Sequence, residues 1–400
     1  MTYRIRRSMS AAAVTAVAVV TMVHVAQTAP AQNAGPAPGA AEVSRTPWGE
    51  PDLQGIWSVE RLVPLERPDG VTTEFYTEEQ IAELDRQRSE FSVFGNHLRA
   101  EPGSEADVAG AYNAVYTSQR PTGRRTGMII DPPDGQMPAL TQETLDRQAE
   151  SREYQLALLQ NTVVCRDSLA GCRGGTYGPP SPRLEELPPR YSTRNINRAN
   201  GPEDRSLGER CMSGSLPHFR GGFTGVFRRI VQSPGVVTVF YDAGQGQGWN
   251  RVISITDAPH LPSHVRQWWG DSRGRWEGDT LVVDVTNFTP KTDYQGSREN
   301  LHLVERWTRT GPDTIELVTT LDDPGVWTRP WTVIQDFNMQ SNEANRIYYE
   351  PRCHEGNYGL PGLLVGRRME EQAFAEGRGP DPATRCIAGC APADGRDPLR

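Results

Sequence analysis

The sequence predicts a mainly β protein: an antiparallel lipocalin-like (calycin-type) barrel with a helical and loop insertion. An alternating segment near residue 55, QGIWSV, resembles the opening strand of lipocalin-like barrels. From about Phe219 onward, short β-branched and aromatic segments alternate with Gly, Pro and Asp turns, which is typical of an antiparallel meander. A meander of this length must close into a barrel or sandwich to protect its edges.

The first residues have the pattern of an export signal. A basic start, RIRR, precedes an apolar run over residues 11–25, and small residues suited to cleavage follow near Ala31. The apolar run is too short for a membrane span. We therefore expect a protein that is periplasmic or secreted.

The charge balance argues against several partners. The signal contains three arginines, so its removal changes the formal net charge from −8 to −11. An acidic exported protein is not expected to bind nucleic acid or an anionic membrane surface. The expected partner is a small-molecule ligand, with no stable membrane association after signal removal.

The pattern divides the chain into segments. The predicted segments are a signal peptide over 1–31, a flexible leader over 32–46, a first barrel strand within 47–60, a helical and loop elaboration over 61–210, an antiparallel barrel meander over 211–360, and a C-terminal extension over 361–400.

Two helices are expected in the elaboration. Thr77 and Gln80 form a capping box before IAELDRQRSEF. Thr141 caps a second helix, QETLDRQAESREYQLALLQ, and a short strand lies between the two helices in RTGMIIDPPDGQMPAL. The apolar face predicted for the second helix contains Leu145, Ala149, Leu156 and Leu159.

The meander is predicted strand by strand. Its segments are GVFRRIVQ, VVTVFYD, WNRVISIT, GRW, TLVVDVTNF, LHLVERWTR, TIELVTTLDD, WTRPWTVIQDF and NRIYYEP.

Six cysteines in an exported chain predict disulfides. Two pairs are close enough in sequence for local loops, and this leaves a long-range pair among several possible connectivities. The predicted pairs are Cys165 with Cys172, Cys386 with Cys390, and Cys211 with Cys353.

Long sequence blocks carry a family resemblance. WGDSRGRWEGDTLVVD, ENLHLVERWTR and CHEGNYGL, together with PWGEPDLQGIW, resemble a large group of uncharacterised exported bacterial proteins. The similarity covers nearly the whole mature chain and implies export, but it implies no activity. The chain departs from the group at Tyr241, which stands where a histidine is expected.

Histidine–carboxylate pairs near strand ends favour acid–base chemistry. In LHLVERW, strand parity places Glu305 on the apolar face and His302 on the opposite face. If the apolar face points inward, burial raises the pKa of Glu305. The alternative is a structural ion pair with Arg273 or Arg275. The predicted catalytic residues are His302, Glu305, His354 and Glu355.

Two other chemistries are disfavoured, and neither a metal nor a cofactor is expected. His260 and His264 have zinc-like spacing only on a helix, which Pro262 opposes. A nucleophilic thiol at Cys353 conflicts with a disulfide, and neighbouring side chains such as His354 point away from it in a strand.

The segment WWGDSRGRWEGDT predicts a ligand site at the barrel mouth. Its tryptophans offer flat surfaces for an aromatic or sugar-like molecule, and an arginine suits an anionic group. The alternative is that the tryptophans plug a barrel end. The predicted ligand-binding residues are Trp268, Trp269, Asp271, Arg273, Trp276 and His260.

These patterns predict a protein that acts on a small apolar or aromatic molecule by cofactor-independent acid–base chemistry, of lyase, hydratase or isomerase type. The alternative is a non-catalytic periplasmic binding or carrier protein. An enzyme requires ionisable groups that converge on one pocket, so the separation of these groups distinguishes the two.

Overall fold

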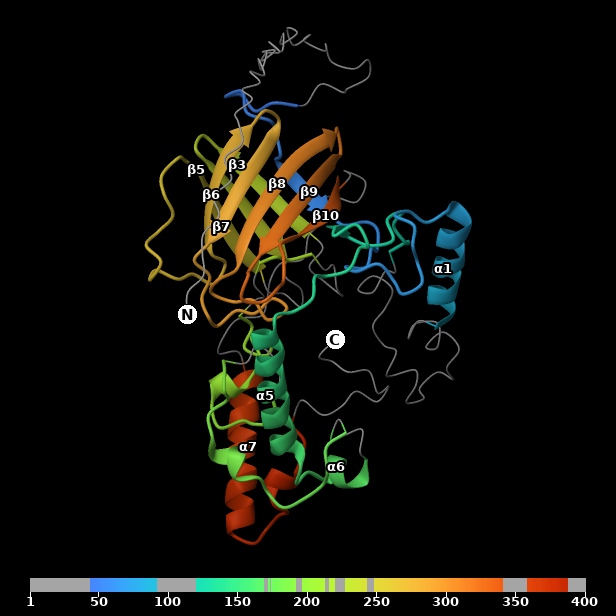
Figure 1. The fold of residues 1–400 in the computed structure, drawn as a ribbon. Coiled ribbons are helices and arrows are strands. Elements are labelled where there is room, and N and C mark those ends of the chain that lie inside the picture. The colour runs from blue at the N-terminus through green and yellow to red at the C-terminus, as the bar shows by residue number, and fades with distance from the viewer. Residues whose placement is uncertain are drawn as a thin grey trace, which may run out of the picture. The chain divides into compact units, whose positions relative to one another are not determined.

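The β-sheet closes into a barrel because its first strand pairs with its last (Figure 1). The computed structural model describes residues 44–91, 120–168, 172, 174–191, 196–212, 216–219, 227–242, 248–340 and 358–387. All of these residues belong to one unit that spans Val43–Arg400. Within them ten strands form one sheet, and nine of these strands make the barrel. The predicted mainly β barrel is therefore confirmed.

The barrel strands follow one another around the wall in chain order. They are β1 (Gly55–Ser58), β3 (Phe227–Ser233), β4 (Val236–Asp242), β5 (Gly248–Ile255), β6 (Asp271–Glu277), β7 (Thr280–Thr286), β8 (His302–Gly311), β9 (Thr314–Asp322) and β10 (Trp331–Met339).

Closure depends on the short strand β1. It pairs antiparallel with β3 along its whole length and with the end of β10, where Trp57 lies opposite Met339. Closure protects the backbone donors and acceptors of these strands from pairing with other chains. β2 (Ile129–Asp131), from the elaboration, adds to β10, with Ile129 opposite Val333.

One pairing departs from the predicted antiparallel meander. β5 and β6 run parallel, with Ser254 opposite Arg273. Parallel neighbours need a connection that returns the chain to its starting end. Residues 256–270 make this return. The last predicted strand, NRIYYEP, lies outside the described residues.

The barrel interior is packed with large side chains. In β9 every second residue is buried, starting at Ile315, as the period of a strand requires. Trp307 of β8 stacks on Phe337 of β10 with ring centroids 5.9 Å apart, across the intervening strand. Each such side chain contributes about 1.5–3 kcal/mol through burial.

Both predicted helix starts are confirmed. In α1 (Glu78–Phe91), Thr77 accepts a hydrogen bond from the Gln80 N–H, and the Gln80 side chain accepts one from the Thr77 N–H. In α5 (Gln142–Leu159), the Thr141 side chain accepts from the Thr144 N–H. The described residues also form the α-helices α6 (Val163–Asp167) and α7 (Gly359–Ala375), and α7 begins just before the predicted C-terminal extension.

The predicted apolar face of α5 is wrong in its first half. Leu145 is 45% exposed, whereas Thr144 and Tyr154 are buried. Only the end of the helix, with Leu158 and Leu159, packs as an apolar segment. The beginning of α5 instead buries polar side chains against the barrel end.

None of the helices in the described ranges is both long and apolar enough to cross a membrane. The predicted signal peptide and leader lie almost entirely outside the described residues, so their assignment stays a prediction.

Two carboxylates that face each other on the outer wall are expected to make the stability of the fold depend on pH. Glu316 of β9 lies opposite Asp336 of β10. Burial raises the pKa of both, and the charge of Asp336 raises that of Glu316 further, while Arg125 acts in the opposite direction. When the pKa of a carboxyl is higher in the folded protein than in the unfolded chain, the protonated carboxyl stabilises the fold. This stabilisation is complete below the pKa of the unfolded chain and is lost as pH rises through the pKa of the folded protein.

We therefore expect Asp336→Asn to raise the free energy of unfolding by about 0.5 kcal/mol at neutral pH, because like charges opposite each other repel. The gain should disappear as pH falls through the raised pKa of Asp336, because the wild-type carboxyl is then protonated and carries no charge. Urea unfolding across pH measures this, with the exposed Asp313→Asn as control. A gain that is independent of pH would contradict the assignment.

Candidate functional site

A charged network occupies the barrel interior. Glu305 of β8 is 2% exposed, on the inward face that strand parity predicts. Its carboxylate pairs with the Arg251 guanidinium of β5 at 2.7 Å and accepts a hydrogen bond from Trp307 Nε1 at 3.1 Å. Arg251 also donates to Tyr241 Oη at 3.1 Å and to Ser272 Oγ at 2.9 Å. Residues from β4, β5, β6 and β8 are thus joined across the barrel.

The network is an ion pair rather than a free base. Burial acts to lower the pKa of Arg251, but the charges and hydrogen bonds of Glu305 and Tyr241 together outweigh it, so the pKa is raised. Burial raises the pKa of Tyr241, which therefore remains a neutral phenol. Glu305 has the structural ion pair that we considered as its alternative role, although its partner is neither Arg273 nor Arg275.

His302 lies on the other side of the same strand. Its Nε2 is 3.0 Å from Asp284 of β7, and its side chain is 40% exposed on the outer wall. Glu305 points inward, so the two predicted acid–base residues face different environments. His302 and Glu305 lie an odd number of positions apart in β8 and face opposite sides of the wall, as strand parity predicts. They do not face one common site, and the predicted catalytic role of each stays a prediction.

The predicted ligand residues His260, Asp271 and Arg273 do lie together, on the outer wall. His260 contacts Asp271 at 2.9 Å through Nδ1 and Asp284 at 2.8 Å through Nε2. Burial acts to raise the pKa of Asp271, but hydrogen bonds from the Leu261 N–H, His260 and Arg273 lower it overall. These contacts fasten the 256–270 connection to the barrel.

The three predicted tryptophans pack into the protein. Trp269 is 4% exposed and stacks on Trp249 with ring centroids 5.8 Å apart and an interplanar angle of 6°. Trp268 and Trp276 are partly buried against the main core. Trp268 and Trp269 lie just before β6 and Trp276 near its far end, so the three side chains do not gather at a single end of the barrel. Their predicted role in ligand binding stays a prediction.

The remaining predicted residues are only partly described. The Cys165–Cys172 disulfide is present, and Cys211 and Cys386 are also disulfide-bonded. Cys353 and Cys390, the predicted partners of these two, lie outside the described residues, as do His354 and Glu355. Their pairings and the predicted catalytic roles stay predictions.

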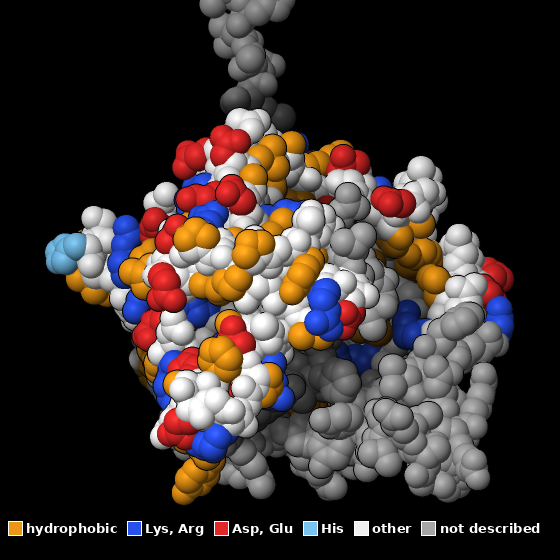
Figure 2. Space-filling model, turned by 90° about the horizontal axis from the view of Figure 1, so that it is seen from below, with side chains coloured by type: hydrophobic (Ala, Val, Ile, Leu, Met, Phe, Trp, Pro, Cys, Tyr) orange, Lys and Arg blue, Asp and Glu red, His pale blue; other side chains and the backbone are white. Residues whose placement is uncertain are grey.

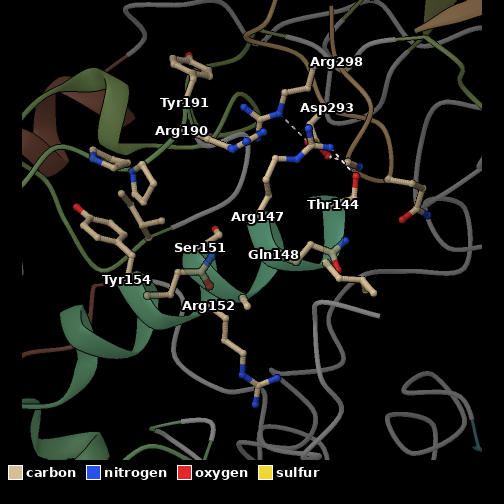
Figure 3. A pocket seen from close by; sticks show the side chains of 18 residues that line it. Thr144, Arg147, Gln148, Ser151, Arg152, Tyr154, Arg190, Tyr191, Asp293 and Arg298 are labelled. Carbon is tan, nitrogen blue, oxygen red and sulfur yellow. Dashed lines mark hydrogen bonds and ion pairs between the residues drawn. The ribbon is translucent and has the colours of Figure 1, made fainter. Parts of the chain in front are cut away.

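A cavity lies outside the barrel interior, beside residues 144–155 of α5. Its volume is about 360 Å³. Figure 3 shows its side chains. It is lined by Thr144, Leu145, Arg147, Gln148, Ala149, Ser151, Arg152, Tyr154 and Gln155 of α5, by Pro188, Pro189, Arg190, Tyr191 and Ile196, and by Asp293, Gln295, Gly296 and Arg298. We call this cavity the α5 pocket.

Two walls of the α5 pocket are attached to the turn between β9 and β10. Thr141 and Thr144 of α5 donate hydrogen bonds to the Gly325 carbonyl at 2.7 and 3.0 Å. In the other wall, Ser297 donates to Asp323 at 2.6 Å. Gly296 has a positive φ of 96°, and an added Cβ would lie 3.3 Å from Thr144 Cγ2, so glycine permits this close approach.

The third wall is held by hydrogen bonds to two tyrosines. Tyr154 of α5 donates to the Glu186 carbonyl at 3.1 Å and accepts from Arg198 at 2.8 Å. Tyr191 accepts from Arg210 at 2.6 Å. The irregular segment 186–191 is therefore joined to α5 at Glu186 and to Arg210 at Tyr191.

The charged lining of the α5 pocket is four arginines and one aspartate, in a chain with a net charge of −8. Arg298 pairs with Asp293 at 3.0 Å, and Arg147 pairs with the exposed Glu143 at 3.0 Å. On the face shown in Figure 2, by contrast, acidic and basic side chains are interspersed. The pocket is a local concentration of positive charge.

The α5 pocket was not predicted from the sequence. Arg147, Ser151 and Tyr154 follow one helical face with spacings of four and three residues, which is a readable signal. No local pattern indicates that Arg190 and Arg298 reach the same place, because they come from distant irregular segments.

Comparison with known proteins adds little. No family model and no curated protein matches the chain. Among solved structures, a crystal structure of a mutant of the fluorescent protein UnaG is similar, with 16% sequence identity and a TM-score of 0.20, covering 33% of this chain and 85% of that chain.

The buried ion pair gives a stability prediction. Glu305→Gln is expected to lower the free energy of unfolding by about 3–5 kcal/mol, because it leaves the Arg251 charge buried without compensation. The double variant Arg251→Met, Glu305→Leu should lower the free energy of unfolding less, because it leaves no buried charge without a partner. Urea unfolding measures both. Glu277→Gln, in an exposed ion pair, serves as control and should change stability little. A single variant as stable as the control would contradict the account of the network.

Proposed function

We propose that this chain is an exported small-molecule binding protein whose ligand site is the α5 pocket. The observation that carries the proposal is the pocket itself, a hollow of about 360 Å³ with walls from three segments. This volume lies at the lower end of the range of about 300–1,000 Å³ that is common for small-molecule sites. The site is thus suited to a small ligand.

Of the two functions expected from the sequence, an acid–base enzyme and a non-catalytic binding protein, the geometry favours the binding protein. Glu305 is neutralised by Arg251 inside the barrel, and His302 pairs with Asp284 on the outer wall. Neither residue lines the α5 pocket. Acid–base catalysis requires groups within hydrogen-bond reach of one substrate. The described residues that we predicted as catalytic do not meet this requirement.

The proposed location outside the cytoplasm rests on the signal pattern and on the resemblance to exported bacterial proteins. The Cys165–Cys172 disulfide supports it, because such bonds persist in oxidising compartments.

Filling the pocket tests the proposal. Ser151 points into the pocket (Figure 3), and Ser151→Trp should abolish ligand binding by occupying the space. Asp146→Trp, exposed on the same helix and absent from the lining, is the matched control. Ligand-observed fluorine NMR with a fragment library measures binding, and thermal unfolding checks that both variants fold.

We expect fragments that bind the wild type and the control but not Ser151→Trp, with no chemical conversion over time. Equal binding to all three proteins would place the ligand elsewhere and contradict the proposal. Conversion of a bound fragment by the wild type would contradict the non-catalytic assignment.

A further inference from the structure

Three arginines from separate segments meet in the α5 pocket. Figure 3 shows Arg147 of α5, Arg190 and Arg298 extending toward one another, whereas Arg152 extends away. Arg147 donates to Thr144 at 2.5 Å, and Arg298 donates to Asp293 at 3.0 Å. Two of the three guanidinium groups are therefore held in position by the walls.

Arg190 differs from its two neighbours. It is partly buried, and within the described part of the chain it has no hydrogen-bond or ion-pair partner. Burial lowers its pKa, and the charges of Arg147 and Arg298 lower it further, while Glu150 and Glu299 act in the opposite direction. The cation is thus desolvated and repelled, which an anion bound in the pocket would relieve.

Apolar surface lies beside this charge. Pro188, Pro189 and Ile196 line the same cavity, and Ile196 is 3% exposed because it packs on Tyr154 and Leu158. A ligand that extends from the arginines along this wall would bury carbon atoms as well as charge. Inorganic anions cannot use this part of the pocket.

We propose that the ligand of the α5 pocket is a small organic acid, with its anionic group against Arg190 between Arg147 and Arg298 and its apolar part against Pro188, Pro189 and Ile196. This inference rests on the proposed function and adds the chemical class of the ligand. A carboxylate suits the site because guanidinium groups bind it through paired, charge-assisted hydrogen bonds.

The test compares acids with their neutral amides. The probes are benzoate, phenylacetate, 2-naphthoate and cyclohexanecarboxylate, each paired with its primary amide, together with inorganic phosphate. Dissociation constants are measured by ligand-observed NMR for the wild type, Arg190→Gln and Arg190→Lys. Arg306→Gln, an exposed arginine on the barrel wall, is the matched control. Thermal unfolding verifies that each variant is folded.

For at least one pair, we expect the wild type and the control to bind the acid on the order of tenfold more tightly than the amide. Arg190→Gln should remove this preference and Arg190→Lys should retain part of it. Acid binding by the wild type should also weaken as ionic strength rises.

Three results would overturn the inference: amides that bind as well as acids in every pair, a preference that survives in Arg190→Gln, or inorganic phosphate that binds as tightly as the best acid. If neutral fragments still bind and Ser151→Trp still blocks them, the binding function stands while the ligand class is wrong. If no probe or fragment binds in the pocket, both fail.

Discussion

The pairing of β1 with β10 closes the barrel, and this constraint determines where the rest of the chain lies. The two strands are separated by most of the sequence, so the elaboration between β1 and β3 must leave and rejoin the wall. Two segments of the chain are attached to the turn between β9 and β10. Hydrogen bonds at Asp323 and Gly325 hold the start of α5 and the 293–298 loop at this turn. The α5 pocket forms between segments that the barrel end brings together.

Two arginines of this protein differ in whether a carboxylate neutralises their charge. This difference separates an arginine that holds the fold together from one that can bind a ligand. Arg251 lies inside the barrel and is neutralised by Glu305, and it also donates hydrogen bonds to Tyr241 and Ser272. Such a pair is costly to break but has no charge left for a ligand. Arg190 has two positive neighbours and no partner among the described residues. It therefore retains the capacity to bind an anion.

Local patterns predicted the parts of the structure that depend on near neighbours. Helix caps at Thr77 and Thr141 involve residues three positions apart, and the parity of β8 places Glu305 inward, so each could be read from a short segment. The partner of Glu305 could not, because Arg251 lies 54 residues away and reaches it across the barrel. The parallel pairing of β5 with β6 is likewise set by the path of a long connection.

The α5 pocket could not be predicted from the sequence either, because its residues are far apart in the chain. The prediction for α5 followed its leucines, but the first half of the helix buries Thr144 and presents Arg147 and Ser151 to a cavity. Its remaining walls are irregular, and irregular segments carry no periodic pattern that would indicate which face they present. Only the fold brings Arg190 and Arg298 to the same place.

A crystal structure of the protein with the tightest-binding acid of the carboxylate panel would show directly where the ligand lies. We expect the carboxylate within hydrogen-bond distance of the Arg190 guanidinium, with the carbon skeleton against Pro188 and Ile196. An acid bound inside the barrel or on another surface, with Arg190 making no contact to it, would contradict the account.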